Sequence, residues 1–272
     1  LQIQSNHIQM SYYFMFVILF FVGAYFEDAY KKKELPHFFK ASGVLALAAV
    51  VGVCINISNL YHTYEYSKET MRGKSELKQE GAAASQTSSG LDRDYITNWS
   101  YGIGETLTLL VPNVKGGGSG STMSQSEAAM AKANPMYNGI YSQLPQYFGE
   151  QPWTAGPVYV GAFVMFLFVL GCFIVKGPLK WALLGATIFS ILLSWGKNFM
   201  GLTDFFIDYV PMYNKFRAVS SILVIAEFTI PLLAIFALKE ILSKPDTLKL
   251  KENRGGVIAT LVLTAGVALI LA

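Results

Sequence analysis

Charge is scarce in this sequence. Only 14% of its 272 residues are Asp, Glu, Lys or Arg, whereas 53% are apolar and the mean hydropathy is +0.39. Soluble domains average about 25% charged residues, so this composition excludes an ordinary soluble enzyme. A net charge of +3 is too small to indicate a nucleic-acid partner. An aromatic content of 14% argues against disorder.

Cysteine is scarce as well, with only Cys54 and Cys172, each inside an apolar run. A disulfide framework or a structural zinc site needs more cysteines in more polar surroundings. The sequence also lacks an initial Met and a signal-peptide pattern, and it ends within an apolar run. These features predict an internal fragment of a longer membrane protein.

What the sequence has in abundance is long apolar runs. There are six, at residues 12–26, 43–57, 158–175, 181–195, 221–238 and 257–272. A membrane span needs about 20 residues, and amphipathic flanks extend the shorter runs toward that length. The sequence therefore predicts an all-α, polytopic transmembrane helix bundle of about six spans, with 1–272 forming a single transmembrane domain.

The connections between the runs alternate in length and charge. Lys and Arg are concentrated in three short connections, residues 27–42, 176–180 and 239–256. Two longer connections, 58–157 and 196–220, carry basic residues more thinly. The positive-inside rule places the short connections in the cytoplasm and predicts that both long loops are extracytoplasmic.

The loop at 58–157 is not uniform. Residues 67–90 are polar, which predicts a mobile excursion, and the Gly-rich stretch 115–121 predicts a flexible linker. The apolar part of 99–112 is too short to span, so we expect an interfacial segment there. Glu105 begins that segment. It is either a first-turn acid favoured by the helix dipole or a functional carboxylate held at the membrane surface.

The loop at 196–220 holds two pairs of charged residues. On a helix, Asp204 and Asp208 share a face, as a solvated face or as paired carboxylates acting on a sugar. Lys215 and Arg217 stand just outside the fifth run. They either snorkel at the interface or bind the phosphate of a lipid donor, which suits the planar fork of arginine.

Two further ionisable residues lie at or within the apolar runs. Glu227 is near the middle of the fifth run, so it should face the bundle interior or a cavity, with a structural or a substrate-binding role. His7 precedes the first run at its outer end, where it is either structural or part of a binding or catalytic site.

Several stretches together resemble the YfhO family of bacterial multi-pass membrane proteins, in wording most like its Bacteroidetes branch. They are S-N-H-I-Q-M-S-Y-Y (5–13), G-L-D-R-D-Y-I-T-N-W-S-Y-G-I-G-E (90–105), Q-P-W-T-A-G-P-V-Y-V-G-A (151–162), L-L-S-W-G-K-N-F (192–199) and N-K-F-R-A-V-S-S (214–221). The resemblance covers nearly the whole chain but only a middle portion of the family's length. Residues 80–89 depart from it as an insert.

The resemblance implies a GT-C-like glycosyltransferase of the bacterial cytoplasmic (inner) membrane. Such enzymes pass a sugar from a polyprenyl-phosphate carrier to a cell-envelope glycan or lipid acceptor on the outer face. They usually carry the main catalytic acid in the first outer loop, which would lie upstream of Leu1. This fragment would then supply other parts of the site.

The implied reaction inverts the sugar C1, with a carboxylate as general base and a cationic group or a divalent metal ion at the departing phosphate. Glu105 and His7 are the catalytic candidates lining the outer cavity. Arg217 and Lys215 are candidates for the phosphate. Trp99 and Tyr101 are candidates for stacking on sugar or isoprene. No other cofactor is predicted.

Two other classes of protein stay open. A transporter or lipid flippase would suit Glu227 in a helix that contains Pro231, although the sequence shows no internal repeat of the kind that transporters carry. A non-catalytic membrane scaffold is the third class. The sugar, the acceptor, the metal requirement and the oligomeric state are not determined by the sequence.

Overall fold

The structure, a computed structural model, describes residues 7–73 and 90–271, and every regular element within them is a helix. The all-α class is therefore confirmed for the described residues. The predicted insert at 80–89 and most of the polar segment at 67–90 lie outside them.

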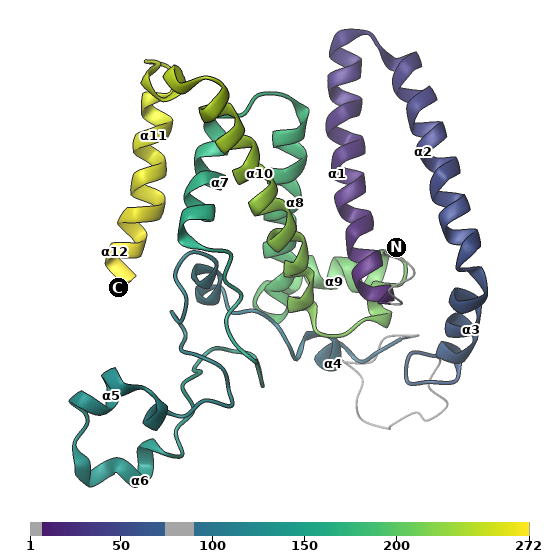
Figure 1. Cartoon of the computed structure of the whole chain (residues 1–272). Helices are drawn as coiled ribbons and strands as arrows, with labels where there is room; N and C mark the ends of the chain where they lie inside the picture. The colour runs from purple at the N-terminus through teal and green to yellow at the C-terminus, as the bar shows by residue number, and fades with distance from the viewer. Residues whose placement is uncertain (1–6, 74–89, 272) are drawn as a thin grey trace.

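All six apolar runs form helices, which stand side by side in Figure 1. They are α1 (Ile8–Lys32), α2 (Leu35–Ile55), α7 (Ala162–Ile174), α8 (Pro178–Ser194), α10 (Val224–Ser243) and the C-terminal series α11 (Arg254–Leu261), η8 (Val262–Gly266) and α12 (Val267–Leu271). The multi-pass character of the chain agrees with this arrangement.

Four of these helical segments are long and apolar enough to cross a membrane: Ile8–Lys32, Leu35–Ile55, Val219–Ser243 and Arg254–Leu271. A fifth candidate arises if α8 is joined to the segment after it, which bends away by 108°. Helix α7 has only 13 residues, although its apolar run covers residues 158–175. Gly161 precedes the helix with a non-helical φ of 102°, so the helix begins at Ala162. The described chain therefore has four or five candidate spans by length and composition, fewer than the six predicted.

The connections sort to two ends of the bundle (Figure 1). The α1–α2, α7–α8 and α10–α11 connections, which carry the clustered Lys and Arg residues, all lie at one end. Residues 56–73, 90–161 and 195–223 lie at the other, here named the loop end. The α1–α2 turn is set by Lys33, whose left-handed conformation ends α1, and by Pro36 in the first turn of α2.

Two apolar clusters hold the bundle together. One joins α7, α8 and α10, which approach closely because Gly171 has no side chain: a Cβ there would stand 3.1 Å from Leu233. The other joins α1 to α8 and to α9 (Met200–Tyr209), largely through packed phenylalanines. Buried polar groups pair across the core, as in the 2.7 Å hydrogen bond between Thr187 and Thr229. Helix α2 has no buried residue.

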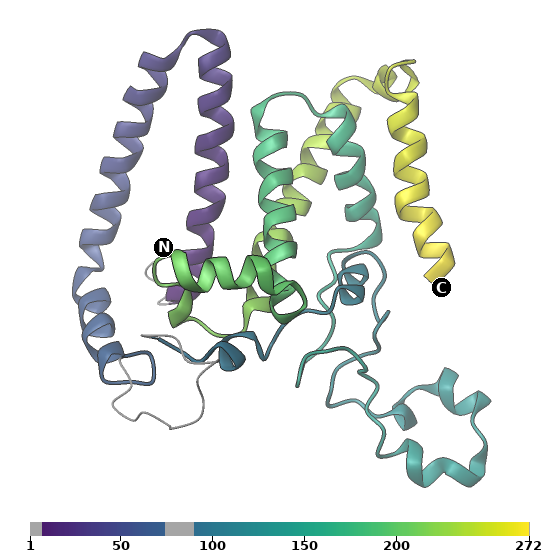
Figure 2. The ribbon, with the colours of Figure 1, turned by 180° about the vertical axis from the view of Figure 1, so that it is seen from behind.

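After α8 the chain turns at Gly196 and runs across the loop end as α9 (Figure 2). Gly196 adopts φ 45°, and a Cβ at this position would collide with Ser100 and Val219. Glycine is therefore needed both for the turn and for close packing of the 99–101 segment beneath it. This contact brings the first long loop against the second.

Residues 113–157 form a lobe that projects from the loop end, with the short helices α5 (Glu127–Lys132) and α6 (Asn138–Tyr141) at its tip (Figure 1). The Gly-rich stretch at its base is not the flexible linker predicted from sequence. A Cβ at Gly116 would overlap the carbonyl of Gln146, and one at Gly118 would stand 2.6 Å from the carbonyl of Ala155. These glycines are needed for close approach of two backbone segments.

Tyr213, the first residue of the 3-10 helix η5 (Tyr213–Lys215) that follows α9, is buried, and its hydroxyl has no hydrogen-bond partner among the described residues. An unsatisfied buried hydroxyl costs about 1–3 kcal/mol. We therefore expect Tyr213→Phe to raise the thermal unfolding temperature of the detergent-solubilised protein. Tyr13→Phe is the matched control, because the equally buried Tyr13 hydroxyl accepts from Gln9 at 2.9 Å. A higher unfolding temperature for the control alone would contradict this account.

Candidate functional site

Glu105 is a buried carboxylate of the loop end that accepts three hydrogen bonds. It lies in the 3-10 helix η1 (Gly104–Leu109) and is only 2% exposed. One oxygen, Oε2, accepts from the backbone N–H groups of Gly102 at 2.6 Å and Glu150 at 3.3 Å. The other, Oε1, accepts from the Tyr147 hydroxyl at 2.6 Å. One donor from the 99–112 segment and two from the base of the lobe therefore hold this carboxylate. A buried carboxylate needs such hydrogen bonds to offset its loss of water.

Two glycines make room for this carboxylate. A Cβ at Gly149 would overlap Oε1 of Glu105 and the hydroxyl of Tyr147, and a Cβ at Gly102 would stand 2.8 Å from Oε2. The base of the lobe and the 99–112 segment thus meet around Glu105 only because neither carries a side chain at these positions.

Gly149→Ala should therefore separate the lobe from η1. Overpacking of this kind costs about 1–3 kcal/mol, and we expect faster amide hydrogen exchange over residues 102–110, with earlier proteolysis within 113–150. Gly139→Ala is the matched control, because nothing lies within 4 Å of a Cβ built there. Equal exchange rates in the two variants would contradict the proposed cradle.

Hydrogen bonds among Tyr101, Thr108 and the backbone of Glu105 also stabilise η1. The Thr108 hydroxyl lies 2.6 Å from the carbonyl of Glu105 and donates to it, so the Tyr101 hydroxyl, 2.5 Å away, is the donor to Thr108. Burial, together with the charge of Glu105, raises the pKa of Tyr101 to about 12. Burial and the bond to Glu105 also raise the pKa of Tyr147. Both phenols stay neutral at physiological pH and act as donors.

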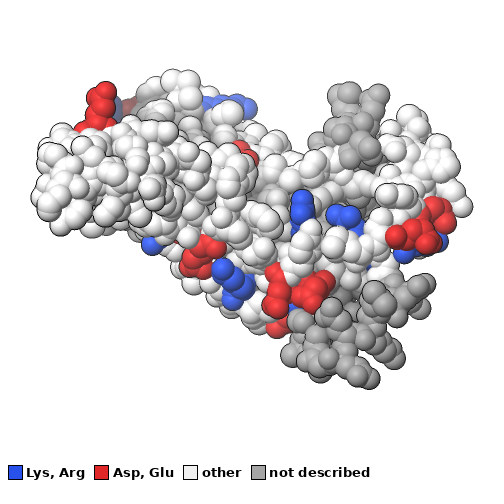
Figure 3. All heavy atoms as spheres, turned by 90° about the horizontal axis from the view of Figure 1, so that it is seen from below, with Lys and Arg blue, Asp and Glu red and all other residues white. Residues whose placement is uncertain are grey.

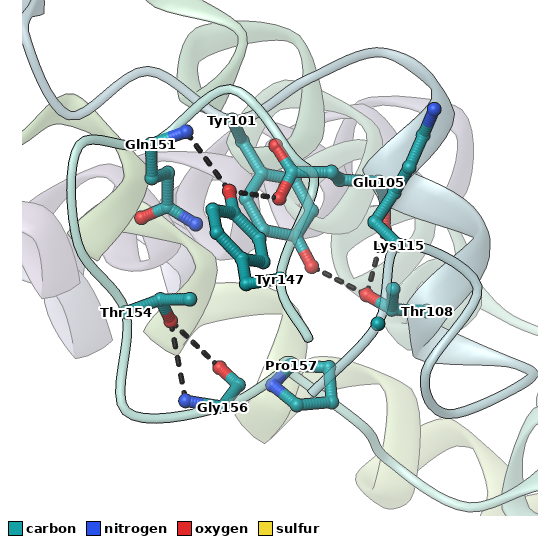
Figure 4. Close-up of a pocket in the computed structure, with 10 residues that line it drawn as sticks. Tyr101, Glu105, Thr108, Lys115, Tyr147, Gln151, Thr154, Gly156 and Pro157 are labelled. Atoms are coloured by element: carbon teal, nitrogen blue, oxygen red, sulfur yellow. Dashed lines mark hydrogen bonds between the residues drawn. The ribbon is translucent and has the colours of Figure 1, made fainter. Parts of the chain in front are cut away.

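The carboxylate faces a small, partly open cavity of about 10 Å³, which is about the volume needed for one water molecule (Figure 4). Tyr147 stands between Gln151 and Glu105, and Lys115 turns its amine away from the carboxylate (Figure 4). In this conformation the site admits a water-sized group and no sugar.

Arg217 forms a second centre nearby. Its exposed guanidinium donates to the Tyr95 hydroxyl at 2.8 Å and lies 5.8 Å from the Tyr95 ring and 6.0 Å from the Trp99 ring. The Gln9 amide holds its backbone carbonyl at 2.7 Å. No acid among the described residues forms a salt bridge with Arg217. The planar guanidinium, held in place without a counter-ion, has the donor geometry that suits a phosphate or carboxylate.

Lys215, two residues before Arg217 in the chain, is paired with Arg72. The Lys215 ammonium donates to the carbonyl of Arg72 at 2.6 Å, and Arg72 Nε donates to the carbonyl of Lys215 at 2.9 Å. Burial lowers the pKa of Lys215. Neither side chain has an acid partner in the described part of the chain. Seen from the loop end, the projecting lobe on the left is largely uncharged, and the rest of the face carries Lys and Arg interspersed with Asp and Glu (Figure 3).

Asp204 and Asp208 share one face of α9, as the spacing predicts, and both bind Arg93. Each Asp Oδ1 lies 2.5 Å from a different guanidinium nitrogen of that arginine. The sequence analysis did not identify Arg93, although it lies within residues 90–105, one of the stretches that carry the family resemblance. The arrangement ties α9 to α4 (Arg93–Thr97) and gives the two carboxylates a structural task.

Glu227 does not face the bundle interior, so that prediction is wrong. The side chain is exposed and lies in the first turn of α10. The buried face of the helix is formed by Ile225, Ala226, Thr229 and Ile230, which leaves Glu227 and Phe228 on the outer side. The charge of Glu227 contributes to the raised pKa of Tyr101, and its place in the first turn of α10 puts it at the loop end of that helix.

His7 is exposed at the start of α1, where its Nδ1 accepts from the N–H of Met10 at 3.4 Å. His7 therefore caps the helix. No hydrogen bond or ion pair among the described residues joins it to Glu105. Trp99 donates through its indole N–H to the carbonyl of Trp153 at 3.1 Å, which links the Arg217 centre to the lobe.

The Glu105 and Arg217 centres are joined by Gln151. Its N–H donates to the Tyr147 hydroxyl at 2.8 Å, and its Oε1 accepts from Ser220 at 3.4 Å. The structure thus brings Glu105, Tyr101, Trp99, Arg217 and Lys215 to one end of the bundle. Among the described residues, no group of three His, Cys, Asp or Glu side chains could hold a metal ion.

No family model matches the chain, and no curated protein or solved structure is similar to it. The family resemblance carried by the sequence motifs stays a prediction.

Proposed function

We propose that this chain takes part in sugar transfer at the outer face of a bacterial cytoplasmic membrane, from a polyprenyl-phosphate carrier to a cell-envelope acceptor. The observation that carries the proposal is that an arginine flanked by aromatic rings, with no salt bridge among the described residues, lies at the same end of the bundle as a buried carboxylate beside a water-sized cavity. The family resemblance supplies the reaction class. The proposed topology keeps six helices across the membrane, with the Lys-rich ends cytoplasmic.

In this reaction Arg217 and Lys215 bind the phosphate of the donor. The arginine fork gives two parallel N–H donors to phosphate oxygens, and the rings of Tyr95 and Trp99 hold its plane in place. As the bond between the sugar C1 and the phosphate oxygen breaks, its electron pair leaves with the phosphate, and the added negative charge is stabilised by both cations. A divalent metal ion is the alternative source of positive charge there.

Glu105 is the general-base candidate for the acceptor. The Tyr147 hydroxyl, 2.6 Å from Oε1, occupies the position that an acceptor hydroxyl would take. When an acceptor replaces it, Glu105 accepts the hydroxyl proton while the acceptor oxygen forms its bond to C1. This step requires the segment that carries Tyr147 to move away from η1. Trp99 remains a candidate for stacking on the sugar or isoprene, and Tyr101 is assigned to support of η1.

A lipid flippase is the second candidate function. The specific observation that favours it is an apolar groove of about 1620 Å³ along α1 and α2, which runs most of the length of both helices. A flippase would move a lipid along that groove without breaking a bond.

The deciding experiment uses the full-length protein in proteoliposomes with a panel of radiolabelled polyprenyl-phosphate sugars. Protein-dependent movement of label from the carrier to an acceptor or to water is the expected result. Movement of intact labelled carrier between leaflets, without release of sugar, would replace transfer by the flippase function. Neither activity in folded protein would leave a non-catalytic scaffold.

A further inference from the structure

Trp153 is an exposed tryptophan at the base of the lobe, and the proposed chemistry gives it no role. It is 59% exposed, and none of the ring contacts or cation–π contacts among the described residues involves its indole. Single exposed aromatic side chains are common on protein surfaces. The surroundings of Trp153 therefore decide whether its ring has a function.

The backbone that carries Trp153 is held by hydrogen bonds to two other segments. The carbonyl of Trp153 accepts from the indole N–H of Trp99 at 3.1 Å. The N–H of Thr154 donates to the Ser119 hydroxyl at 2.9 Å, and the carbonyl of Thr154 accepts from the N–H of Ser119 at 2.8 Å. Because this backbone is already ordered, a ligand that binds the exposed ring has less conformational entropy to overcome.

Trp153 belongs to the chain of contacts that joins the two centres of the candidate site. On one side, the Trp99 ring lies 6.0 Å from the guanidinium of Arg217, and its indole N–H binds the Trp153 carbonyl. On the other side, Gln151 donates through its N–H to the phenol that holds Glu105. In the proposed transfer, C1 of the sugar breaks its bond to the phosphate at Arg217 and bonds to an acceptor oxygen at Glu105. The sugar must therefore reach both centres, so Trp153 is placed to contact its ring.

The groups next to Trp153 are uncharged and suit a sugar. A pyranose presents C–H groups on a face of its ring, and these groups pack on the electron-rich face of an indole. Its hydroxyls need neutral donors and acceptors. The Gln151 Oε1 and the Ser220 hydroxyl lie 3.4 Å apart, which is long for an O–H···O hydrogen bond, so both can also bond a sugar hydroxyl. The lobe itself is largely uncharged (Figure 3).

We propose that the indole of Trp153 is the platform on which an uncharged pyranose of the donor stacks, with Gln151 and Ser220 as partners of its hydroxyls. The proposal rests on the proposed transfer function. It adds to that function a sugar subsite and a substrate class, a neutral pyranose.

The test measures binding of polyprenyl phosphates with and without a sugar to the full-length protein in phosphatidylcholine nanodiscs. The sugar-bearing carriers hold glucose, galactose, mannose or N-acetylglucosamine. In Trp153→Ala we expect the affinity for the preferred sugar-bearing carrier to fall about tenfold, which corresponds to about 1.4 kcal/mol, with the affinity for the sugar-free carrier unchanged. Trp153→Tyr keeps an aromatic face and should recover most of the loss. Only the backbone of Trp153 is hydrogen-bonded, so neither variant removes such a bond.

Trp181→Ala is the matched control, because Trp181 is 60% exposed but lies in the first turn of α8, at the opposite end of the bundle. Equal affinities of the unmodified protein for all carriers, with and without sugar, would overturn the proposal. An equal loss of affinity for both kinds of carrier in Trp153→Ala would also overturn it, and would make Trp153 an anchor at the membrane interface. Tighter binding of a carrier that bears a hexuronic acid would contradict the uncharged substrate class.

The same variants distinguish this proposal from the transfer function. A gain in affinity from the sugar that is lost in Trp153→Ala, without any transfer by the unmodified protein, would support the sugar subsite and contradict the transfer function. Transfer at a normal kcat/KM in Trp153→Ala would contradict the sugar subsite and leave the transfer function standing.

Discussion

Replacing Glu105 by glutamine is expected to lower the rate of sugar transfer at least about 100-fold, because a positioned general base contributes about 10²–10⁴-fold to such reactions. Glutamine keeps the size of the side chain and one oxygen, which can still accept from the N–H groups of Gly102 and Glu150. Its amide nitrogen faces the Tyr147 oxygen and cannot remove a proton from an acceptor hydroxyl. The measurement is kcat in the proteoliposome assay, together with thermal unfolding.

Two further variants separate chemistry from packing at this site. Glu150→Gln is the matched control, because the Glu150 side chain is exposed and only its backbone N–H contacts Glu105. It should transfer sugar normally. Tyr147→Phe removes one donor from the carboxylate without adding bulk, and we expect its activity to be retained. If Tyr147→Phe loses as much activity as Glu105→Gln, the hydrogen-bonded scaffold and not the carboxylate sets the rate, and Glu105 is a structural residue.

The sequence predicts the helices well because long apolar runs between polar connections have few alternatives. Each of the six runs contains a helix, and the connections between them alternate between the two ends of the bundle. The length of α7 could not be predicted in this way. The start of α7 depends on the backbone conformation at Gly161. An apolar sequence does not show whether its first residues are helical or extended.

The candidate site is harder to predict because it is assembled over long distances. Glu105 is recognisable as an acid in an apolar stretch, but its partners Tyr147 and Gly149 lie more than forty residues away in an uncharged segment without any motif. The face on which Glu227 falls depends on where α10 meets α7 and α8. The Gly-rich stretch at 115–121 has the composition of a linker, and only the packing of Gln146 and Ala155 against it shows otherwise.

Replacing Arg217 by alanine is expected to raise KM for the polyprenyl-phosphate donor about 10- to 100-fold. Hydrogen bonds to charged groups contribute about 1.5–3 kcal/mol, and each 1.4 kcal/mol is a factor of ten in affinity. A larger fall in kcat than in affinity would place Arg217 on the departing phosphate in the transition state. The measurement is initial rate against donor concentration at fixed protein in the membrane.

The variant Arg217→Lys separates the contribution of the positive charge to donor affinity from that of the planar guanidinium. Lysine keeps the charge but lacks the planar fork and the stacking between Tyr95 and Trp99, so we expect it to recover only part of the affinity. Arg254→Ala is the control, since Arg254 is also exposed and free of salt bridges among the described residues but lies at the opposite end of the bundle. An unchanged donor KM in correctly inserted Arg217→Ala would contradict its role at the phosphate and would show that this arginine only anchors the loop end at the membrane surface.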